Sequence, residues 1–369
     1  MFRNRAAWIN SRPGGRWRLL PSPFSPALIA TYAPNIIKFK FRQHGTLSRY
    51  LILATGNNNS TLVAVSQDLI TWETAVMLNF EGKDIAFAPS FGTNATIYIL
   101  GVDPTAGYCY TLLSEPGLTP SFFPPTALFY SPTILETIPS FNAIVACGSA
   151  GWNYFAPTVS WTAVANATTY GPISKSLITP AGQMALVGHR WFSSDHQIIT
   201  QGTSPSSPRS GWFSDINYGF DRTSVNLTSS TSGPGISPSA GGAVLARAQT
   251  RVVAGPPSPL DPLYVDVAYY TIYGSQLQPI ISSFESSQTA IFPYSSKKIS
   301  GFAVHPETNI LYLAFDSGEI YTSDNFGASW QLSSIQLATD NLFVNNIYIE
   351  SGAKGLTMVN AAGQIVTSP

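Results

Sequence analysis

The segment YTSDNFGASW, from Tyr321 to Trp330, places a carboxylate among small and turn-forming residues and ends on a tryptophan. It lies inside the longer stretch NILYLAFDSGEIYTSDNFGASWQLSSI, where short β-branched and aromatic runs alternate with turn residues. This pattern predicts a strand, a Gly-containing turn, a second strand, a second turn and a strand that begins at Trp330.

The same order recurs along the chain. RYLILATGNNNSTLVAVSQDLITWETAV repeats it with Asp68 and Trp72, and NSRPGGRW near the start repeats the frame with Trp17. Weaker copies contain Phe122, Trp161, Trp212 and Ile280, so the units are about 50 residues long. Because helical periodicity is almost absent, the sequence predicts an all-β fold. We expect one β-propeller domain over residues 1–369, with four-stranded blades, seven preferred and six as the alternative.

The spacing Ser/Thr-x-Asp-x-(x)-Gly-x-Ser/Thr-Trp resembles the Asp box, or BNR repeat, of sialidase-like β-propellers. The clear copy contains Asp324, Gly327 and Trp330, whereas the copy with Asp68 and Trp72 lacks the glycine and the Trp17 copy lacks the aspartate. The resemblance implies a structural turn between the third and fourth strands of a blade. In it we expect Asp324 to accept backbone hydrogen bonds, Gly327 to adopt positive φ and Trp330 to insert between sheets.

The two ends of the chain together supply the strands of one blade in this repeat. GQIVTSP at the end is typical of a third strand, and GGRWRLLP near the start is typical of the missing fourth strand. The sequence therefore predicts that they pair in one blade and close the ring, which removes unpaired strand edges. Residues 1–20 supply this closing strand, a basic arm, or both.

Charge is scarce and unevenly distributed. Only 10% of residues are charged, and no Asp or Glu precedes Asp68. This asymmetry predicts either docking to an acidic partner or mutual neutralisation of the two ends, and the candidate interaction residues at the start are Arg3, Arg5, Arg12, Arg16 and Arg18. The basic region is short and the net charge is zero, which does not favour nucleic-acid binding. No apolar run is long enough to span a membrane, and no secretion signal is expected.

Residue types suited to catalysis are few. GHRWFSSDHQ, residues 188–197, is the one polar cluster of that kind, and it lacks a Gly-x-Ser-x-Gly motif and metal-ligand spacing. The arginine pattern of sialidases is absent, although a divergent glycosidase needs only two carboxylates. Cys109 and Cys147 lie in apolar runs and are expected to be buried thiols. We expect no enzyme activity, no cofactor and no metal.

The composition, the Ser/Thr/Asn-rich loops and the degenerate boxes resemble propellers of bacteriophage tails and virions. This resemblance implies a structural or interaction protein of the nozzle, hub or fibre-attachment type, located in the virion, with copies of itself and other tail proteins as partners. The alternative is a host-glycan-binding receptor-recognition protein or a divergent sialidase-like hydrolase. It is motivated by the aromatic residues Trp152 and Tyr154, which we expect in a loop.

Overall fold

Strands dominate the computed structural model, which confirms the all-β prediction. The structure describes residues 17–44, 47–89, 96–103, 107–114, 118–122, 132–148, 151–155, 162–163, 170–179, 182–190, 196–204, 207–212, 220–230, 242–253, 263–273, 276–279, 288–292, 297–333, 347–351 and 355–368. Within these residues, no helix is both long and apolar enough to cross a bilayer. The prediction of a single domain over residues 1–369 stays a prediction.

The described strands form seven antiparallel sheets, which we number in chain order. Sheets 1 to 3 each take four consecutive strands. Sheet 1 contains β2 (Asn35–His44), β3 (Leu47–Gly56), β4 (Ser60–Ser66) and β5 (Glu73–Met77); sheet 2 contains β6 (Glu81–Phe87), β7 (Thr96–Asp103), β8 (Gly107–Ser114) and β9 (Thr119–Phe122); sheet 3 contains β10 (Pro132–Ile138), β11 (Ala143–Gly148), β12 (Gly151–Phe155) and β13 (Thr162–Ala163).

Sheets 4 to 6 continue the pattern, except that two short strands, β21 and β22, both pair with β20 in sheet 5. Sheet 4 contains β14 (Tyr170–Ile178), β15 (Met184–Arg190), β16 (His196–Ser204) and β17 (Ser207–Trp212); sheet 5 contains β18 (Phe220–Ser230), β19 (Gly242–Val253), β20 (Leu263–Tyr273), β21 (Gln276–Pro279) and β22 (Gln288–Phe292); sheet 6 contains β23 (Ile299–Val304), β24 (Leu311–Phe315), β25 (Ile320–Ser323) and β26 (Gln331–Ser333).

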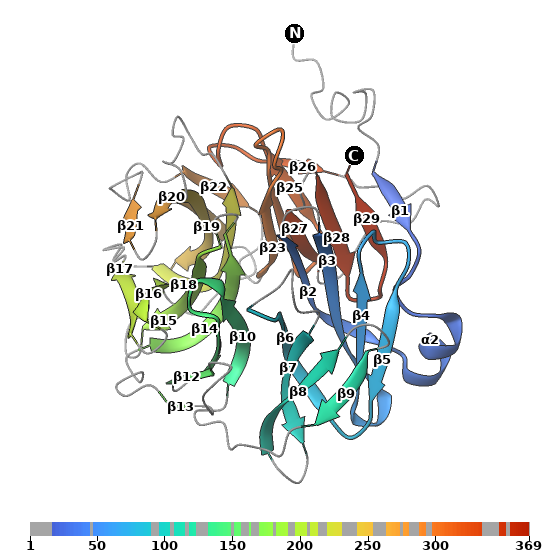
Figure 1. Cartoon of the computed structure of the whole chain (residues 1–369). Helices are drawn as coiled ribbons and strands as arrows, with labels where there is room; N and C mark the ends of the chain where they lie inside the picture. Colours follow the sequence, from blue (N-terminus) through green and yellow to red (C-terminus); the bar gives the residue numbers. More distant parts are fainter. Residues whose placement is uncertain are drawn as a thin grey trace.

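Sheet 7 joins segments from opposite ends of the sequence. It contains β27 (Ile347–Ser351), β28 (Leu356–Asn360) and β29 (Ile365–Thr367), and its fourth strand is β1 (Arg18–Leu20). β1 runs antiparallel to β29, and Arg18 is the register partner of Thr367. Figure 1 shows this junction, where the blue β1 lies beside the red β29.

The first strands of successive sheets lie next to one another. β2 contacts β6, β6 contacts β10, and the same relation continues through β14, β18, β23 and β27. β27 in turn contacts β2, so the contacts return to sheet 1. In Figure 1 the sheets follow one another around the molecule in the order of the sequence colours.

The described core lies between neighbouring sheets. Each of seven hydrophobic clusters is built from two consecutive sheets, and the cluster that contains Phe39 joins sheet 7 to sheet 1. In β3, for example, Leu51 and Leu53 face sheet 2, whereas Ile52 and Ala54 face sheet 7. Both faces of such a sheet are buried, which explains why strands such as STLVAVS and LYLAF are continuously apolar instead of alternating.

Two local features modify the strands and their connections. The sequence analysis missed the short helix α2 (Pro26–Tyr32). Pro26 is its first residue, and the Ser25 side chain before it accepts a hydrogen bond from the Leu28 N–H at 3.3 Å.

The first strands of sheets 1 to 6 each contain a shift in register. In β2 it falls between Ile36 and Lys38, and in β6 between Gly82 and Asp84. These bulges re-aim the side chains that follow them. The short connections η1 (Asn57–Asn59) and η2 (Pro139–Phe141) are 3-10 turns.

Candidate functional site

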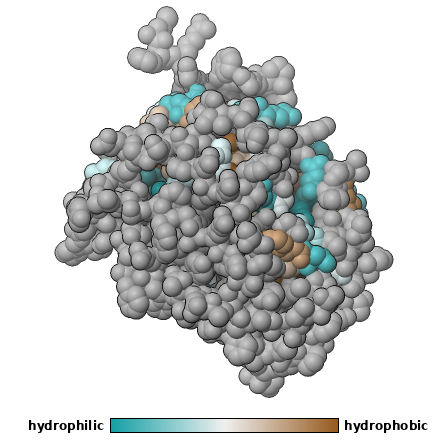
Figure 2. All heavy atoms as spheres, turned by 60° about the vertical axis from the view of Figure 1, so that its left-hand side comes forward, coloured by the Kyte–Doolittle hydropathy of each residue, from teal (hydrophilic) through white to brown (hydrophobic). Residues whose placement is uncertain are grey.

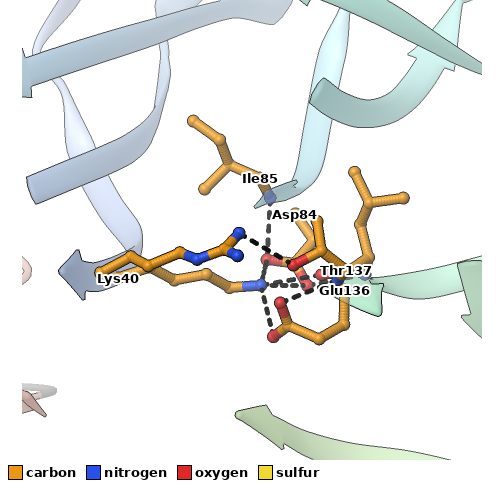
Figure 3. Close-up of polar contacts among 7 residues, drawn as sticks. Lys40, Asp84, Ile85, Glu136 and Thr137 are labelled. Carbon is orange, nitrogen blue, oxygen red and sulfur yellow. Dashed lines mark hydrogen bonds and ion pairs between the residues drawn. The ribbon is translucent and has the colours of Figure 1, made fainter. Parts of the chain in front are cut away.

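A buried ion-pair cluster joins the first strands of sheets 1, 2 and 3. Lys40 on β2 extends its ammonium toward β6 and β10, and Figure 3 shows the two carboxylates that it meets. Its Nζ lies 3.3 Å from Asp84 Oδ1 and 3.4 Å from Glu136 Oε2, and it donates a hydrogen bond to the Leu135 carbonyl oxygen at 2.8 Å. One side chain therefore bridges three sheets.

Backbone groups hold both carboxylates in place. Asp84 Oδ2 accepts the N–H of Leu135 in sheet 3 at 2.8 Å, and Asp84 Oδ1 accepts the N–H of Ile85 at 2.8 Å. Glu136 Oε1 accepts the N–H of Thr137 at 3.0 Å. Buried carboxylates require such donors as well as a counter-charge, and this cluster supplies both.

The two carboxylates keep Lys40 protonated in spite of its burial. Removal from water alone would lower the pKa of Lys40, but Asp84 and Glu136 outweigh that effect, so the pKa is raised. The Lys40 side chain is 13% exposed, while the side chains of Asp84 and Glu136 are 0% and 6% exposed. Lys40 consequently carries its positive charge inside the fold.

Arg42 adds a second link from β2. Its Nη1 donates to the Ala88 carbonyl at 3.1 Å and to Thr137 Oγ1 at 3.4 Å, so it also reaches sheets 2 and 3. Burial lowers the pKa of Arg42, against the opposing field of Glu136. Cys147 lies close to the cluster, and burial, with the fields of Glu136 and Asp84, raises the pKa of its thiol well above the usual value.

This arrangement suits a clamp better than acid–base catalysis. A general acid or base must reach a substrate proton, directly or through one water. Asp84 and Glu136 instead direct their oxygens at Lys40 and at backbone N–H groups. In the part of the chain that the structure describes, no group of three or more His, Cys, Asp or Glu residues could hold a metal ion.

The three tryptophans of the sequence repeat each pack on a hydrophobic cluster between two sheets. Trp17 packs on the cluster between sheets 6 and 7, Trp72 on the cluster between sheets 7 and 1, and Trp330 on the cluster between sheets 5 and 6. Each tryptophan directly precedes the fourth strand of its own sheet and packs on a cluster that includes the preceding sheet, which for sheet 1 is sheet 7. The seven residues that carry the sequence repeat all lie within, or one residue before or after, a fourth-strand segment: residues 17, 72, 122, 161, 212, 280 and 330.

In the turn of residues 66–72, which we call the Trp72 turn, Asp68 caps the backbone as expected. Asp68 Oδ1 accepts the N–H groups of Ile70 and Thr71, each at 2.8 Å, and the Ser66 hydroxyl donates to Asp68 Oδ1 at 3.1 Å. These donors, the Thr71 N–H first, lower the pKa of Asp68.

In the equivalent turn of residues 323–330, the Trp330 turn, the sequence analysis missed a capping residue. Asn325 Oδ1 accepts the Ser329 N–H at 3.0 Å and the Ser323 hydroxyl at 2.9 Å. Asp324, the residue before it, is exposed. Ser323 corresponds to Ser66, because each serine donates its hydroxyl to the side chain two positions later. Gly327 has φ 93°, as predicted.

The sequence analysis also missed a strained residue in each turn. Leu69 and Phe326 have φ values of 64° and 60°, a region that bulky residues rarely adopt. Both side chains pack on the preceding sheet interface, and Tyr269 donates from its hydroxyl to the Phe326 carbonyl at 3.1 Å. This packing therefore stabilises a positive φ at two bulky residues, a conformation that their residue types do not predict.

The predicted interaction residues fall in different places. Arg18 is exposed on β1, while Arg3, Arg5, Arg12 and Arg16 lie outside the described residues. Trp152 and Tyr154 were expected in a loop, and this is wrong: they occupy β12, where Trp152 pairs with Cys147 and Tyr154 with Val145. A third strand between two partners cannot offer the mobile aromatic loop that motivated the glycan alternative.

The structure bears on two further expectations, one about residues 188–197 and one about the two cysteines. GHRWFSSDHQ was expected to be a loop, but its ends are strands: His189 and Arg190 complete β15, and His196 opens β16 as the partner of His189. Residues 191–195 lie outside the described residues. Cys147 is a buried free thiol, as expected, and Cys109 lies in β8.

The cluster around Lys40 was not identified from the sequence, although a signal for it exists. Lys40, Asp84 and Glu136 are charged residues within the strands NIIKFKFRQH, EGKDIAF and PTILETI, and each directly follows or precedes a buried apolar residue: Phe39, Ile85 and Leu135. A charge inside a strand that is buried on both faces needs a partner. The pairing also bears on the charge asymmetry, because Lys40 is neutralised by carboxylates of the next two sheets and not by the acidic end of the chain.

Comparisons with known proteins identify the fold and no family. No protein-family model and no curated protein matches the chain. Among solved structures, the chain is similar to YCF48 from Cyanidioschyzon merolae, with a TM-score of 0.56, 14% identity, and coverage of 96% of this chain and 98% of that one. It is also similar to YCF48 bound to D1 peptide, with a TM-score of 0.55, 14% identity and 96% of each chain covered.

Two further structures extend the comparison. The Neurospora crassa Pan2 WD40 domain has a TM-score of 0.53, 9% identity and 96% coverage of both chains. Virginiamycin B lyase from Staphylococcus aureus has a TM-score of 0.51, 8% identity, and coverage of 96% of this chain and 98% of that one. At these identities the similarity establishes the β-propeller fold alone, and a fold shared with a lyase does not assign an activity.

Proposed function

We propose that this chain is a structural and interaction protein, a closed seven-bladed propeller that assembles as a multimer with other proteins of a virion or phage tail. The seven sheets would be its blades, and the pairing of β1 with β29 would close the ring. The circular series of contacts between first strands and the seven inter-sheet clusters support this architecture. Asp-box-like capping at Asp68 and Asn325 supports the relation to BNR-type blades.

The observation that carries the non-enzymatic role is the burial and pairing of the charged residues around Lys40. The chain has few charged residues, yet it buries Lys40, Asp84 and Glu136 together. Fully paired groups of this kind fix the relative positions of three sheets, and they leave no accessible carboxylate pair at this point. A ring whose sheets are fixed in this way can serve as a scaffold that holds surface loops in place for binding to another protein.

The proposed contact region is the segment before β1. In sheet 7 the third strand, β29, ends at Thr367, and the fourth strand, β1, begins at Arg18. Four arginines precede Trp17 with no acidic residue among them. We therefore propose that Arg3, Arg5, Arg12 and Arg16 contact an acidic surface of a neighbouring protein.

The exposed apolar residues do not supply a more obvious interface. Leu19, Ile29, Ile70, Leu78 and Leu332 are each more than 40% exposed, but they belong to separate strands, turns and a helix. On the face drawn in Figure 2, the hydrophobic residues among those described appear in small separate areas beside hydrophilic ones. A similar structure bound to a peptide supports a protein as the partner.

The test compares the full chain with a variant in which Arg3, Arg5, Arg12 and Arg16 are replaced by serine. Native mass spectrometry of the wild type should show a multimer, and images of the native particle should contain a ring of copies. The variant should lose assembly while its melting temperature is retained, because Trp17 and β1 are intact. A monomeric wild type found in no larger particle contradicts the proposal. Glycan-array binding that is lost in Trp152→Ala would favour the glycan alternative instead.

A further inference from the structure

The loop between β23 and β24 places a buried histidine against the end of the neighbouring sheet. His305 is 6% exposed, and its Nε2 lies 3.3 Å from Oγ of Ser368, the residue directly after β29. Ser368 Oγ also accepts the Leu356 N–H at 2.7 Å. A second hydrogen bond, from the Ser351 hydroxyl to the Val304 carbonyl at 2.7 Å, ties the start of the same loop to sheet 7.

The hydrogen bonds of the ring assign its protonation state. His305 Nδ1 accepts two backbone N–H groups, from Glu307 at 3.2 Å and from Thr308 at 3.3 Å. A nitrogen that accepts hydrogen bonds carries no proton, so the ring is neutral with its proton on Nε2. Nε2–H is then the donor toward Ser368 Oγ.

A second proton cannot be added without loss of these contacts. Protonated Nδ1–H would point at two other N–H donors, so either the turn at Glu307 and Thr308 opens or the ring rotates. Rotation removes Nε2–H from Ser368 Oγ and weakens the contact between the loop and the end of β29. We propose that His305 is an acid-sensitive latch, which ties sheet 6 to the end of β29 when neutral and releases it when protonated.

The electrostatic surroundings act in the same direction. Burial lowers the pKa of His305, and the carboxylate of Glu307, on the same loop, opposes this shift with a smaller effect. The residues from the side of sheet 7 that take part in these hydrogen bonds are uncharged: Ser351, Leu356 and Ser368. Among the described residues, Glu307 is the charged group that affects the pKa of His305. A neutral buried histidine contributes stability above the pKa of the unfolded residue, near 6.5, and this contribution is lost as the pH falls through the folded value.

The latch matters because β29 holds β1. The register pairs of Arg18 with Thr367 and of Leu20 with Ile365 are what connect the beginning of the chain to sheet 7. Loosening of Ser368 therefore exposes the end of β29 next to this junction. Mild acid would increase local opening at sheet 7 before the other sheets are affected.

The test is hydrogen exchange of individual amides between pH 7.5 and pH 5.0, corrected for the intrinsic rates. The protection of the Glu307, Thr308 and Leu356 amides should fall on acidification, by about tenfold for each unit that separates the unfolded and folded pKa of His305. Amides of β7 and β11, in sheets 2 and 3, should keep their protection. An NMR titration of the His305 ring should give a pKa below 6.5.

Two variants isolate the histidine. His305→Asn keeps a side-chain acceptor for the turn but cannot titrate, so its Leu356 amide should show no pH dependence over this range. Ser368→Ala keeps the histidine and removes its partner, so it should show weak protection of Leu356 at both pH values. The control His44→Asn should behave like the wild type. A ring pKa of 6.5 or above, or unchanged protection of Leu356 at pH 5.0, overturns the proposal.

Discussion

Trp17 packs edge-to-face against Tyr312, with ring centroids 5.8 Å apart and ring planes at 73°. Trp17 directly precedes β1 in sheet 7, whereas Tyr312 lies on β24 in sheet 6. The start of the described chain is therefore held in two ways, by the ladder between β1 and β29 and by an aromatic contact with a different sheet. This relationship separates the role of residues 17–20 from that of the residues before them.

Two deletions should have different effects on stability. Removal of residues 1–20 takes away Trp17, β1 and the buried side chain of Leu20, so we expect a loss of about 3–5 kcal/mol in the free energy of unfolding. Removal of residues 1–16 keeps all of these and should leave the urea midpoint nearly unchanged. Equal midpoints for the two deletions would show that β1 contributes nothing to closure.

Replacement of Lys40 by methionine should be among the most destabilising single changes. It leaves Asp84 and Glu136 buried without the ammonium that both of them contact, and loss of one partner of a buried ion pair costs about 3–5 kcal/mol. In the control, Lys83→Met, an exposed pair with Glu81 is lost at a cost of less than about 1 kcal/mol. Because the pKa of Lys40 is raised, its stabilisation is complete below about pH 10.4 and declines as the pH rises through the folded value.

Urea unfolding at pH 7 and pH 11 measures both effects. Combining Lys40→Met with Asp84→Asn and Glu136→Gln should recover part of the loss, since the uncompensated charges are then removed. A Lys40→Met variant as stable as the Lys83→Met variant would contradict the clamp.

Local sequence patterns predicted the architecture better than the interior chemistry. Strand runs and the tryptophan repeat depend on neighbours in sequence, so Trp17, Trp72 and Trp330 could be placed at sheet interfaces in advance. The Lys40 cluster depends on residues 44 and 96 positions apart that meet only when three sheets are arranged around one another. The role of Asn325 in the Trp330 turn also escaped prediction, because adjacent Asp324 and Asn325 are both able to cap a turn and the sequence does not say which N–H group each one meets.

The cap that Asn325 provides in the Trp330 turn can be tested by alanine substitution. Asn325→Ala removes the acceptor for the Ser329 N–H and for the Ser323 hydroxyl, so it should cost about 1 kcal/mol. Thermal unfolding of the variant and the wild type at one pH measures this loss. An unchanged melting temperature would show that Asn325 does not stabilise the turn.

Acid should weaken the Trp72 turn through Asp68. Its pKa is lowered by the Thr71 and Ile70 N–H groups, so its contribution to stability is present above the unfolded pKa near 3.9 and is lost as the pH falls through the folded value. Asp68→Asn keeps an acceptor oxygen but cannot titrate. Its stability should therefore decline less than that of the wild type between pH 4.5 and pH 2.5, whereas Gln67→Asn should follow the wild type. Parallel curves for Asp68→Asn and the wild type would exclude a titrating cap.

A buried glutamine offers a substitution that should stabilise the fold. Gln249 on β19 is 0% exposed, and within the described part of the chain neither its Nε2 nor its Oε1 has a hydrogen-bond partner. A buried amide left in this state costs about 1–3 kcal/mol, so Gln249→Met, which is similar in volume and apolar, should raise the free energy of unfolding by about 1 kcal/mol. The matched control is Gln183, which is also buried but accepts the Thr179 hydroxyl at 2.7 Å. Gln183→Met should be destabilising in the same urea titration. If Gln249→Met also lowers the midpoint, the amide is hydrogen-bonded after all, and a buried water is the partner to look for.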